Sequence, residues 1–288
     1  MNMISRRLAL AALLAAACAL SPLPLHAAGR AECLSLQSKI LKQSVPYCVL
    51  LPPSYDSDKN RLYPVLYFLH GLGGNERSFL ESGGINLVQD LWDQRKIGEF
   101  LMVFPDGYDS FYINSYDGRF RYEDFFLREF IPDIETRYRV EPGRKFRGIS
   151  GISMGGYGAL HLAFAHPKIF GSVSAHSAAL MEKLPQFSGN GPPGLAKVNP
   201  EYWNENNPLT LAKFAHLSGL EIYFDCGTED DYGFYAGAKI LDEELAKRRI
   251  PHEFHLYPGA HNWEYFAAHI PASLEFHSKA FGLNPSER

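Results

Sequence analysis

The stretch that decides the fold is RGISGISMGGYGAL, Arg147–Leu160. It contains Gly-Ile-Ser twice, ending at Ser150 and at Ser153, and only Ser153 has a glycine two positions away on both sides. The resulting G-x-S-x-G pattern is typical of a nucleophile on a sharp strand-to-helix turn, where flanking side chains would collide with the backbone. The stretch therefore predicts a strand over 145–150, a nucleophile at Ser153 and a helix over 154–165. The alternative is a glycine-rich turn that only tightens helix–sheet packing.

Apolar runs of strand length alternate with helical patterns along the rest of the chain. An opening hairpin is predicted over 34–51, and a long helix over 122–138 carries Pro132, which should kink it. Further strands are predicted at 62–69, 100–104, 172–175, 220–226 and 253–257, and further helices at 85–95, 232–248 and 263–281. This alternation predicts an α/β fold with a mostly parallel central sheet, helices on both faces and an N-terminal antiparallel hairpin.

Two segments differ from the rest of the chain: an N-terminal leader and an irregular stretch inside the domain. Residues 1–28 combine Arg6-Arg7 with the apolar run Leu8–Leu20, which is typical of a secretory signal peptide and too short to span a bilayer. An alternative is a lipoprotein, anchored in the membrane through an acylated Cys18. We expect residues 29–288 to form a single domain of an exported protein, periplasmic or secreted, in which 180–208 is an irregular, lid-like excursion rich in Pro, Gly and Asn.

Charge and cysteine content narrow the function classes. The net charge of 288 residues is −4, and neither sign forms long runs, so we expect no nucleic-acid partner. Cys33 and Cys48 flank the predicted hairpin and form either a disulfide, if the compartment is oxidising, or two buried thiols. Cys226 is then the odd cysteine, and no CxxC is present to suggest a metal or redox site.

The loop after the strand at 62–69 reads His70-Gly71-Leu72-Gly73-Gly74. In a fold with a nucleophile turn of this kind, that loop supplies one backbone N–H for an oxyanion, and the residue after the nucleophile supplies the other. Leu72 and Met154 are therefore the candidate donors. A dinucleotide loop is the competing interpretation, but its third glycine is replaced by Glu76, whose charge would repel a pyrophosphate.

A serine nucleophile needs a base, and the base needs an acid to orient it. His261 follows the last predicted strand on a Pro-Gly turn, where the chain order Ser, acid, His places the base. Most other histidines are set aside by position: His26 lies in the leader, and surface or packing roles are expected for His161, His166, His252, His255, His269 and His277. HEFH at 252–255 lacks the spacing of a zinc site, so no metal or cofactor is predicted. For the acid, Asp225 is still on the strand at 220–226, where a structural role is the alternative. Spacing alone does not choose among Glu229, Asp230 and Asp231 on the following loop, and Asp106, which precedes the serine, is a poorer candidate.

Five segments together resemble the esterase D group of α/β-hydrolases. They are LYFLHGLGG, YEDFFLREFIPDIETRYRV, GISMGGYGALHLAFAHPKIF, DCGTEDD and PGAHNWEYF. The resemblance implies an α/β-hydrolase fold with a Ser153, Asp230 and His261 triad, because the family's acid stands three residues after the glycine of its D-x-G-x-x-D segment. It also implies oxyanion donors at Leu72 and Met154.

The predicted function is an exported serine carboxylesterase that hydrolyses short-chain acyl esters through an acyl-enzyme. Alternatives within the resemblance are a feruloyl or acetylxylan esterase acting on polysaccharide-linked esters, an S-formylglutathione hydrolase, and an acyltransferase of the mycolyltransferase type. An export signal argues against the formylglutathione substrate, because that branch is typically cytosolic. A non-catalytic binding module is the remaining alternative. Trp263, Asn114 and Tyr116 are the predicted lining of the substrate pocket.

Overall fold

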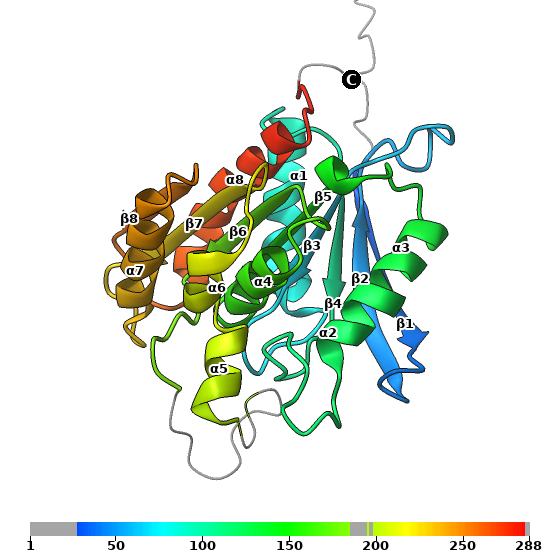
Figure 1. Ribbon diagram of the computed structural model, residues 1–288. Helices are drawn as coiled ribbons and strands as arrows, with labels where there is room; N and C mark the ends of the chain where they lie inside the picture. Colours follow the sequence, from blue (N-terminus) through cyan, green and yellow to red (C-terminus); the bar gives the residue numbers. More distant parts are fainter. Residues whose placement is uncertain (1–27, 185–194, 196–197, 286–288) are drawn as a thin grey trace, which may run out of the picture.

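The computed structural model describes residues 28–184, 195 and 198–285 (Figure 1). Its centre is an eight-stranded sheet in the order β1-β2-β4-β3-β5-β6-β7-β8. The first two pairings, β1 with β2 and β2 with β4, are antiparallel, and all others are parallel. The strands are β1 Arg30–Gln37, β2 Ser44–Leu51, β3 Val65–Leu69, β4 Leu101–Pro105, β5 Arg147–Ile152, β6 Ser172–His176, β7 Glu221–Gly227 and β8 Glu253–Tyr257. The predicted mostly parallel sheet with an N-terminal hairpin is confirmed.

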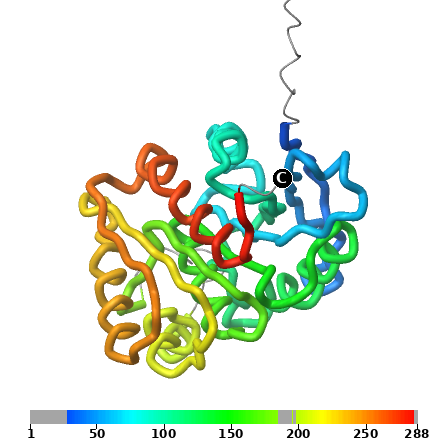
Figure 2. Tube along the Cα trace, turned by 90° about the horizontal axis from the view of Figure 1, so that it is seen from above, coloured from blue at the N-terminus to red at the C-terminus, as the bar shows by residue number. Residues whose placement is uncertain are grey.

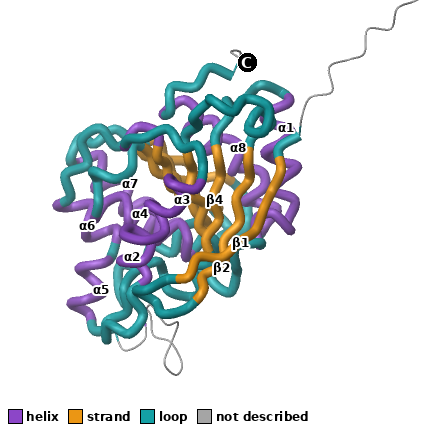
Figure 3. The backbone as a smooth tube through the Cα atoms, turned by 90° about the vertical axis from the view of Figure 1, so that its right-hand side faces the viewer, coloured by secondary structure: helices purple, strands orange, loops and turns teal. Residues whose placement is uncertain are grey.

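Helices cover both faces of this sheet (Figures 1 and 3). One face packs against α1 Ile85–Asp93 and α8 Trp263–Ala280. The other face carries α2 Tyr122–Phe125, α3 Ile131–Arg137, α4 Met154–Ala165, α5 Pro200–Asn206, α6 Pro208–Phe214 and α7 Phe234–Lys247. Because apolar side chains are needed on both faces, β3 and β4 are buried at every residue, as the continuous apolar runs in the sequence indicate.

Two predicted regions differ from the structure in detail. The long helix around Pro132 is continuous, but a π-helical turn over Phe126–Phe130 stands directly before α3, where the proline lacks an N–H to donate. The excursion over 180–208 was expected to be irregular, and that is wrong for its last part, which contains α5. Asn199 and Asn207 each cap a helix whose first residue is proline, accepting the N–H of Tyr202 and Leu209 respectively. The Asn-Pro pairs were helix starts, not loop residues.

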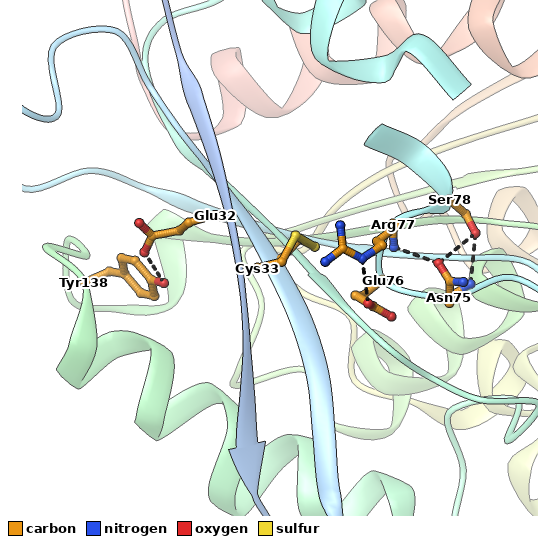
Figure 4. Close-up of a disulfide and its surroundings, with 8 residues drawn as sticks. Glu32, Cys33, Asn75, Glu76, Arg77, Ser78 and Tyr138 are labelled. Carbon is orange, nitrogen blue, oxygen red and sulfur yellow. Dashed lines mark hydrogen bonds and ion pairs between the residues drawn. A yellow bond between two sulfur atoms is a disulfide. The ribbon is translucent and has the colours of Figure 1, made fainter. Parts of the chain in front are cut away.

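A disulfide joins Cys33 of β1 to Cys48 of β2, at directly opposed positions of the antiparallel pair. Figure 4 shows Cys33 on one face of β1 and Glu32 on the other, where Glu32 accepts a hydrogen bond from Tyr138 Oη at 2.7 Å. The edge strand is thus fastened covalently to β2 and by a side-chain contact to the residue after α3. Cys226 is a buried free thiol.

The carboxyl ends of the parallel strands lie at the lower end of Figure 1. The first and the last described residues lie near each other at the opposite end, as Figure 2 also shows. Loops that follow parallel strands carry the functional groups of such sheets, so the lower end is where a site is expected. No helix in the described ranges is long and apolar enough to cross a membrane.

Candidate active site

Ser153 occupies the turn between β5 and α4 in a strained backbone conformation. Its φ is 55° and its ψ is −118°, a region that non-glycine residues avoid at a cost of about 1–3 kcal/mol. A Cβ on Gly151 would lie 2.3 Å from the carbonyl carbon of Gly155, and a Cβ on Gly155 would lie 2.1 Å from the carbonyl oxygen of Leu69. Both flanking positions therefore require glycine, which is the steric reason for the G-x-S-x-G pattern.

Ser150, the other serine of the repeated tripeptide, is part of the sheet. It is fully buried in β5, and its Oγ accepts a hydrogen bond from Ser174 Oγ at 2.7 Å. Ser174 in turn contacts His277 Nε2 at 2.9 Å. Ser153 lines a cavity and Ser150 does not. The two serines therefore differ in whether a substrate can reach them.

Asp230 is the acidic side chain that reaches the His261 ring. Its Oδ2 lies 2.6 Å from His261 Nδ1, and its Oδ1 accepts the backbone N–H groups of Tyr232 and Phe234 at 3.0 and 3.3 Å. Asp231 accepts only the backbone N–H of His261. Of the other candidates, Asp225 binds a different histidine, Glu229 is exposed, and Asp106 approaches His70.

Asp230 remains ionised at neutral pH. Burial raises the pKa of its carboxyl group, but the hydrogen bond from His261, the attraction of that imidazole and the two backbone N–H donors outweigh burial and hold the pKa below its usual value. An ionised carboxylate at Nδ1 fixes the tautomer and the orientation of the His261 ring. The other ring nitrogen is then available to exchange a proton with a substrate.

Leu72 and Met154, the two candidate oxyanion donors, line the same cavity as Ser153. Met154 is the first residue of α4, and a Cβ on Gly71 would lie 3.3 Å from Ser153 Cβ, so the Gly71–Leu72 backbone borders the serine. In the described part of the chain, neither N–H has a hydrogen-bond acceptor. Two free donors beside a strained serine are what an oxyanion hole requires.

His70 orients the Leu72 donor, a role that the sequence reasoning missed. Its Nδ1–H donates to Gly71 O at 2.7 Å, and its Nε2 accepts the Gly107 N–H at 2.8 Å, so the ring is the neutral Nδ1–H tautomer. Gly74 N–H donates to the same carbonyl at 3.0 Å. Because a trans peptide points its C=O and N–H in opposite directions, two donors on Gly71 O direct the Leu72 N–H away from them. The signal was the histidine directly before the glycine-rich loop.

A cavity of about 560 Å³ brings these groups together. Its lining includes Ser153, His261, Leu72 and Met154, and most other lining residues are apolar: Phe111, Ile152, Ala179, Met181, Tyr232, Phe234 and Phe266. The hydrogen bonds of the described residues do not include one between Ser153 Oγ and His261 Nε2. This contact is commonly long in free enzymes and tightens when substrate binds.

The three predicted pocket residues do not line this cavity. Trp263 packs its ring edge-on against Phe79, with ring centroids 5.9 Å apart, as part of the hydrophobic cluster under the sheet face that packs against α1 and α8. Asn114 binds Asp124, and Tyr116 packs against Tyr202 of α5. The prediction was wrong because closeness in sequence to His261, or a place in a loop after a strand, does not determine which way a side chain points.

Three aromatic rings surround His261 instead. Tyr232, Phe234 and Phe266 each pack edge-on against the imidazole, with ring centroids 4.9, 5.5 and 5.3 Å away. Two of them, Tyr232 and Phe234, stand two and four residues after Asp230 in the sequence, which was the available signal. These rings confine the imidazole and line the same cavity. No group of three or more His, Cys, Asp or Glu side chains within the described residues could hold a metal ion.

A comparison with known protein families shows which family has this sequence. The model of the Esterase family, described as "Putative esterase", matches residues 38–277. The chain belongs to this esterase family. The match spans the described sheet from the turn after β1 to α8, so it includes the nucleophile turn, the acid turn and the base turn together.

Individual relatives are moderately similar. Esterase Rv1288 of Mycobacterium tuberculosis is 29% identical over 242 residues, covering 74% of this chain and 51% of its own length. The chain therefore spans about half the length of that mycobacterial relative. The S-formylglutathione hydrolase of Mus musculus is 26% identical over 260 residues, covering 83% of this chain and 90% of its own. A solved structure of a ferulic acid esterase superposes with a TM-score of 0.79 at 28% identity, over 88% of this chain and 99% of that one.

Proposed function

We propose that this esterase-family chain is a serine carboxylesterase in which Ser153, His261 and Asp230 form the catalytic triad. The observation that carries the proposal is the strained Ser153, which shares one cavity with the imidazole that Asp230 orients. Backbone strain persists only where the surrounding structure imposes it, and it clusters at reactive positions in proteins.

The reaction proceeds in two halves on this chain's own groups. Ser153 Oγ attacks the ester carbonyl carbon as His261 Nε2 takes its proton, and the N–H groups of Leu72 and Met154 hold the oxyanion. The intermediate collapses by breaking the bond to the leaving oxygen, which takes the proton from His261. Water then attacks the acyl-enzyme by the same route and releases the acid. Asp230 stabilises the imidazolium formed in each half.

The cavity is large enough to hold an acyl group longer than acetyl. A volume of about 560 Å³ lies within the range of small-molecule sites, and its lining is mostly apolar and partly aromatic. Short acyl esters fit with room to spare. A second candidate is an ester of an aromatic acid, which the aromatic lining and the similarity to a ferulic acid esterase favour.

Export is the proposed localisation. Two features support it: the signal-like pattern of residues 1–28, of which 1–27 lie outside the described residues, and the Cys33–Cys48 disulfide, since disulfides persist in oxidising compartments. Expression of the full chain, followed by fractionation and N-terminal sequencing of the mature protein, tests this. Cytoplasmic recovery with an intact leader would contradict it.

One substrate panel tests the activity. The purified mature protein is assayed with p-nitrophenyl esters of increasing chain length, methyl ferulate and S-formylglutathione, each with and without an added alcohol acceptor. Hydrolysis of the p-nitrophenyl esters supports the carboxylesterase, and a higher kcat/KM for methyl ferulate than for every aliphatic ester supports the second candidate. Failure to hydrolyse any ester, together with failure to label with a fluorophosphonate, contradicts the proposal.

A further inference from the structure

A second Ser-His-Asp set lies buried beneath the candidate triad. His176 Nδ1 is 2.7 Å from Asp225 Oδ2, and His176 Nε2 is 2.8 Å from Ser273 Oγ. Tyr265 Oη donates to the other oxygen of Asp225 at 2.7 Å. All four side chains are buried, and none lines the cavity. We call Ser273, His176, Asp225 and Tyr265 the buried set.

The direction of its hydrogen bonds shows that the buried set is not a second nucleophilic site. Ser273 Oγ donates to Ile270 O in its own helix at 3.0 Å, so it accepts the Nε2–H of His176. A nucleophilic serine would instead give its proton to the histidine. Every polar side-chain atom of the four residues has a hydrogen-bond partner. A fully satisfied buried network of this kind rigidifies the elements that it joins.

The buried set touches each element that carries a member of the candidate triad. On the nucleophile side, the backbone carbonyl of His176, at the end of β6, accepts the Ser153 N–H at 2.9 Å. On the acid side, Asp225 stands in β7, which runs directly into the turn with Asp230. On the base side, Tyr265 and Ser273 both belong to α8, whose cap follows His261.

Tyr265 makes the link to the base turn. It lies in the first turn of α8, where Asn262 caps the helix by accepting the Tyr265 N–H at 3.0 Å, and His261 immediately precedes that cap. A Cβ on Gly259 would lie 2.7 Å from Tyr265 Cδ2, so the ring packs directly under the base turn. Glu229 N–H donates to Gly259 O at 3.0 Å, which joins the acid turn to the base turn above the same ring.

We propose that the buried set positions the triad, with Tyr265 as its principal positioning residue. The proposal rests on the proposed function of Ser153, His261 and Asp230. The Tyr265 hydroxyl, held by Asp225, sets where the first turn of α8 sits on the sheet, and thereby where His261 stands relative to Ser153. Removing the hydroxyl leaves a buried carboxylate oxygen without its donor and releases this turn. A displacement of about 1 Å is enough to cost up to about 100-fold in rate.

The test compares Tyr265→Phe with a matched Tyr67→Phe control. Tyr67 is a buried tyrosine of β3 whose hydroxyl has no hydrogen-bond partner among the described residues, so both variants lose one buried hydroxyl. Steady-state kinetics with p-nitrophenyl butyrate should show that Tyr265→Phe lowers kcat about 10-fold and leaves KM within about two-fold. Tyr67→Phe should change neither. The rate of fluorophosphonate labelling should fall with kcat.

A second variant keeps the proposal open to refutation if Tyr265→Phe does not fold. Ser273→Ala removes the acceptor of His176 Nε2–H at the other end of the buried set and should also lower kcat with little change in KM. If the set acts as one unit, the kcat effect of the double variant is smaller than the product of the single effects. A folded Tyr265→Phe or Ser273→Ala with the kcat of Tyr67→Phe overturns the proposal.

Amide hydrogen exchange separates this proposal from the proposed function. Exchange at residues 258–262 should be faster in Tyr265→Phe than in the wild type and in Tyr67→Phe, because the base turn loses its support. If the wild type hydrolyses no ester, the proposed function fails, and the exchange result alone then decides whether Tyr265 holds the turn. Unchanged exchange in that turn contradicts the positioning role even when the enzyme is active.

Discussion

The molecule contains two Ser-His-Asp sets that share a short aspartate–histidine contact but not an environment. The aspartate–histidine contact is 2.6 Å in the candidate triad and 2.7 Å in the buried set. Ser153 stands strained at the wall of a cavity, whereas Ser273 lies inside α8 and gives its proton to Ile270 O. The comparison teaches that short contacts among these three residue types do not make a catalyst. Access and the direction of the serine proton separate a reactive set from a supporting one.

The largest effect is expected at the nucleophile. Ser153→Ala should lower kcat by about 10⁴-fold or more, because the covalent route is lost and only binding and the oxyanion hole remain. Ser150→Ala, its partner in the repeated tripeptide, should leave kcat within about three-fold. The measurement is kcat for p-nitrophenyl butyrate on variants with matched circular dichroism. Inactivity of Ser150→Ala with an active Ser153→Ala would reverse the assignment.

The aspartate of the candidate triad should also contribute more to kcat than the aspartate of the buried set. Asp230→Asn should lower kcat by about 10⁴-fold, since the amide stabilises the wrong tautomer of His261. Asp225→Asn affects the triad only by displacing it and should lower kcat by about 10- to 100-fold. Both variants are compared by kcat, with urea unfolding as the measure of folding. Equal losses in two folded variants would remove the distinction between the triad and the buried set.

A smaller loss of kcat is expected at His70, in the loop that carries the candidate Leu72 donor, and a second variant at the same position serves as the control. His70→Ala removes the donor that fixes Gly71 O and should lower kcat by about 100-fold, close to the loss of one oxyanion donor. His70→Asn places an amide N–H near the position of Nδ1 and should recover most of this loss. If His70→Asn is as slow as His70→Ala, orientation of the Leu72 peptide is not what His70 contributes.

The smallest effect is expected at a third carboxylate–histidine cluster, which is remote from the cavity. Glu123 accepts hydrogen bonds from His161 Nε2 at 2.9 Å and His166 Nε2 at 2.6 Å. Burial raises the Glu123 pKa, but these bonds and the attraction of both rings outweigh it and hold the pKa well below 4.5. A carboxyl group with a depressed folded-state pKa stabilises the fold above its unfolded-state pKa, and this stability is lost as pH falls.

Glu123→Gln should therefore lower the free energy of unfolding by about 1–3 kcal/mol at pH 7. The gap between wild type and variant should narrow as pH falls below 4.5, the ordinary pKa of glutamate. Urea unfolding at a series of pH values measures this, and kcat at pH 7 should stay within about two-fold. A gap that is constant with pH would show that ionisation of Glu123 does not stabilise the fold.

Much of the fold was predictable because its patterns are local. The helix over 154–165 and the strand over 253–257 agree with α4 and β8 at both ends. Apolar runs identify buried strands because both faces of the sheet are covered. The helix starts at Asn199-Pro200 and Asn207-Pro208 were missed, because the same residues that favour loops also cap helices.

The sequence by itself determined the candidate nucleophile and its turn. Only Ser153 has glycines at both positions where a side chain would strike the backbone, and that requirement is met within five consecutive residues. The histidine after the last strand followed from chain order, and its acid was first chosen by resemblance to a family.

Only the tertiary structure decided which carboxylate faces which imidazole. Asp225 and Asp230 are five residues apart, yet one points into the sheet toward His176 and the other out of the turn toward His261. These contacts join residues 49 and 31 positions apart in the chain. Side-chain direction at the end of a strand depends on how the strand leaves the sheet and on what packs against it, and neither is written in local spacing.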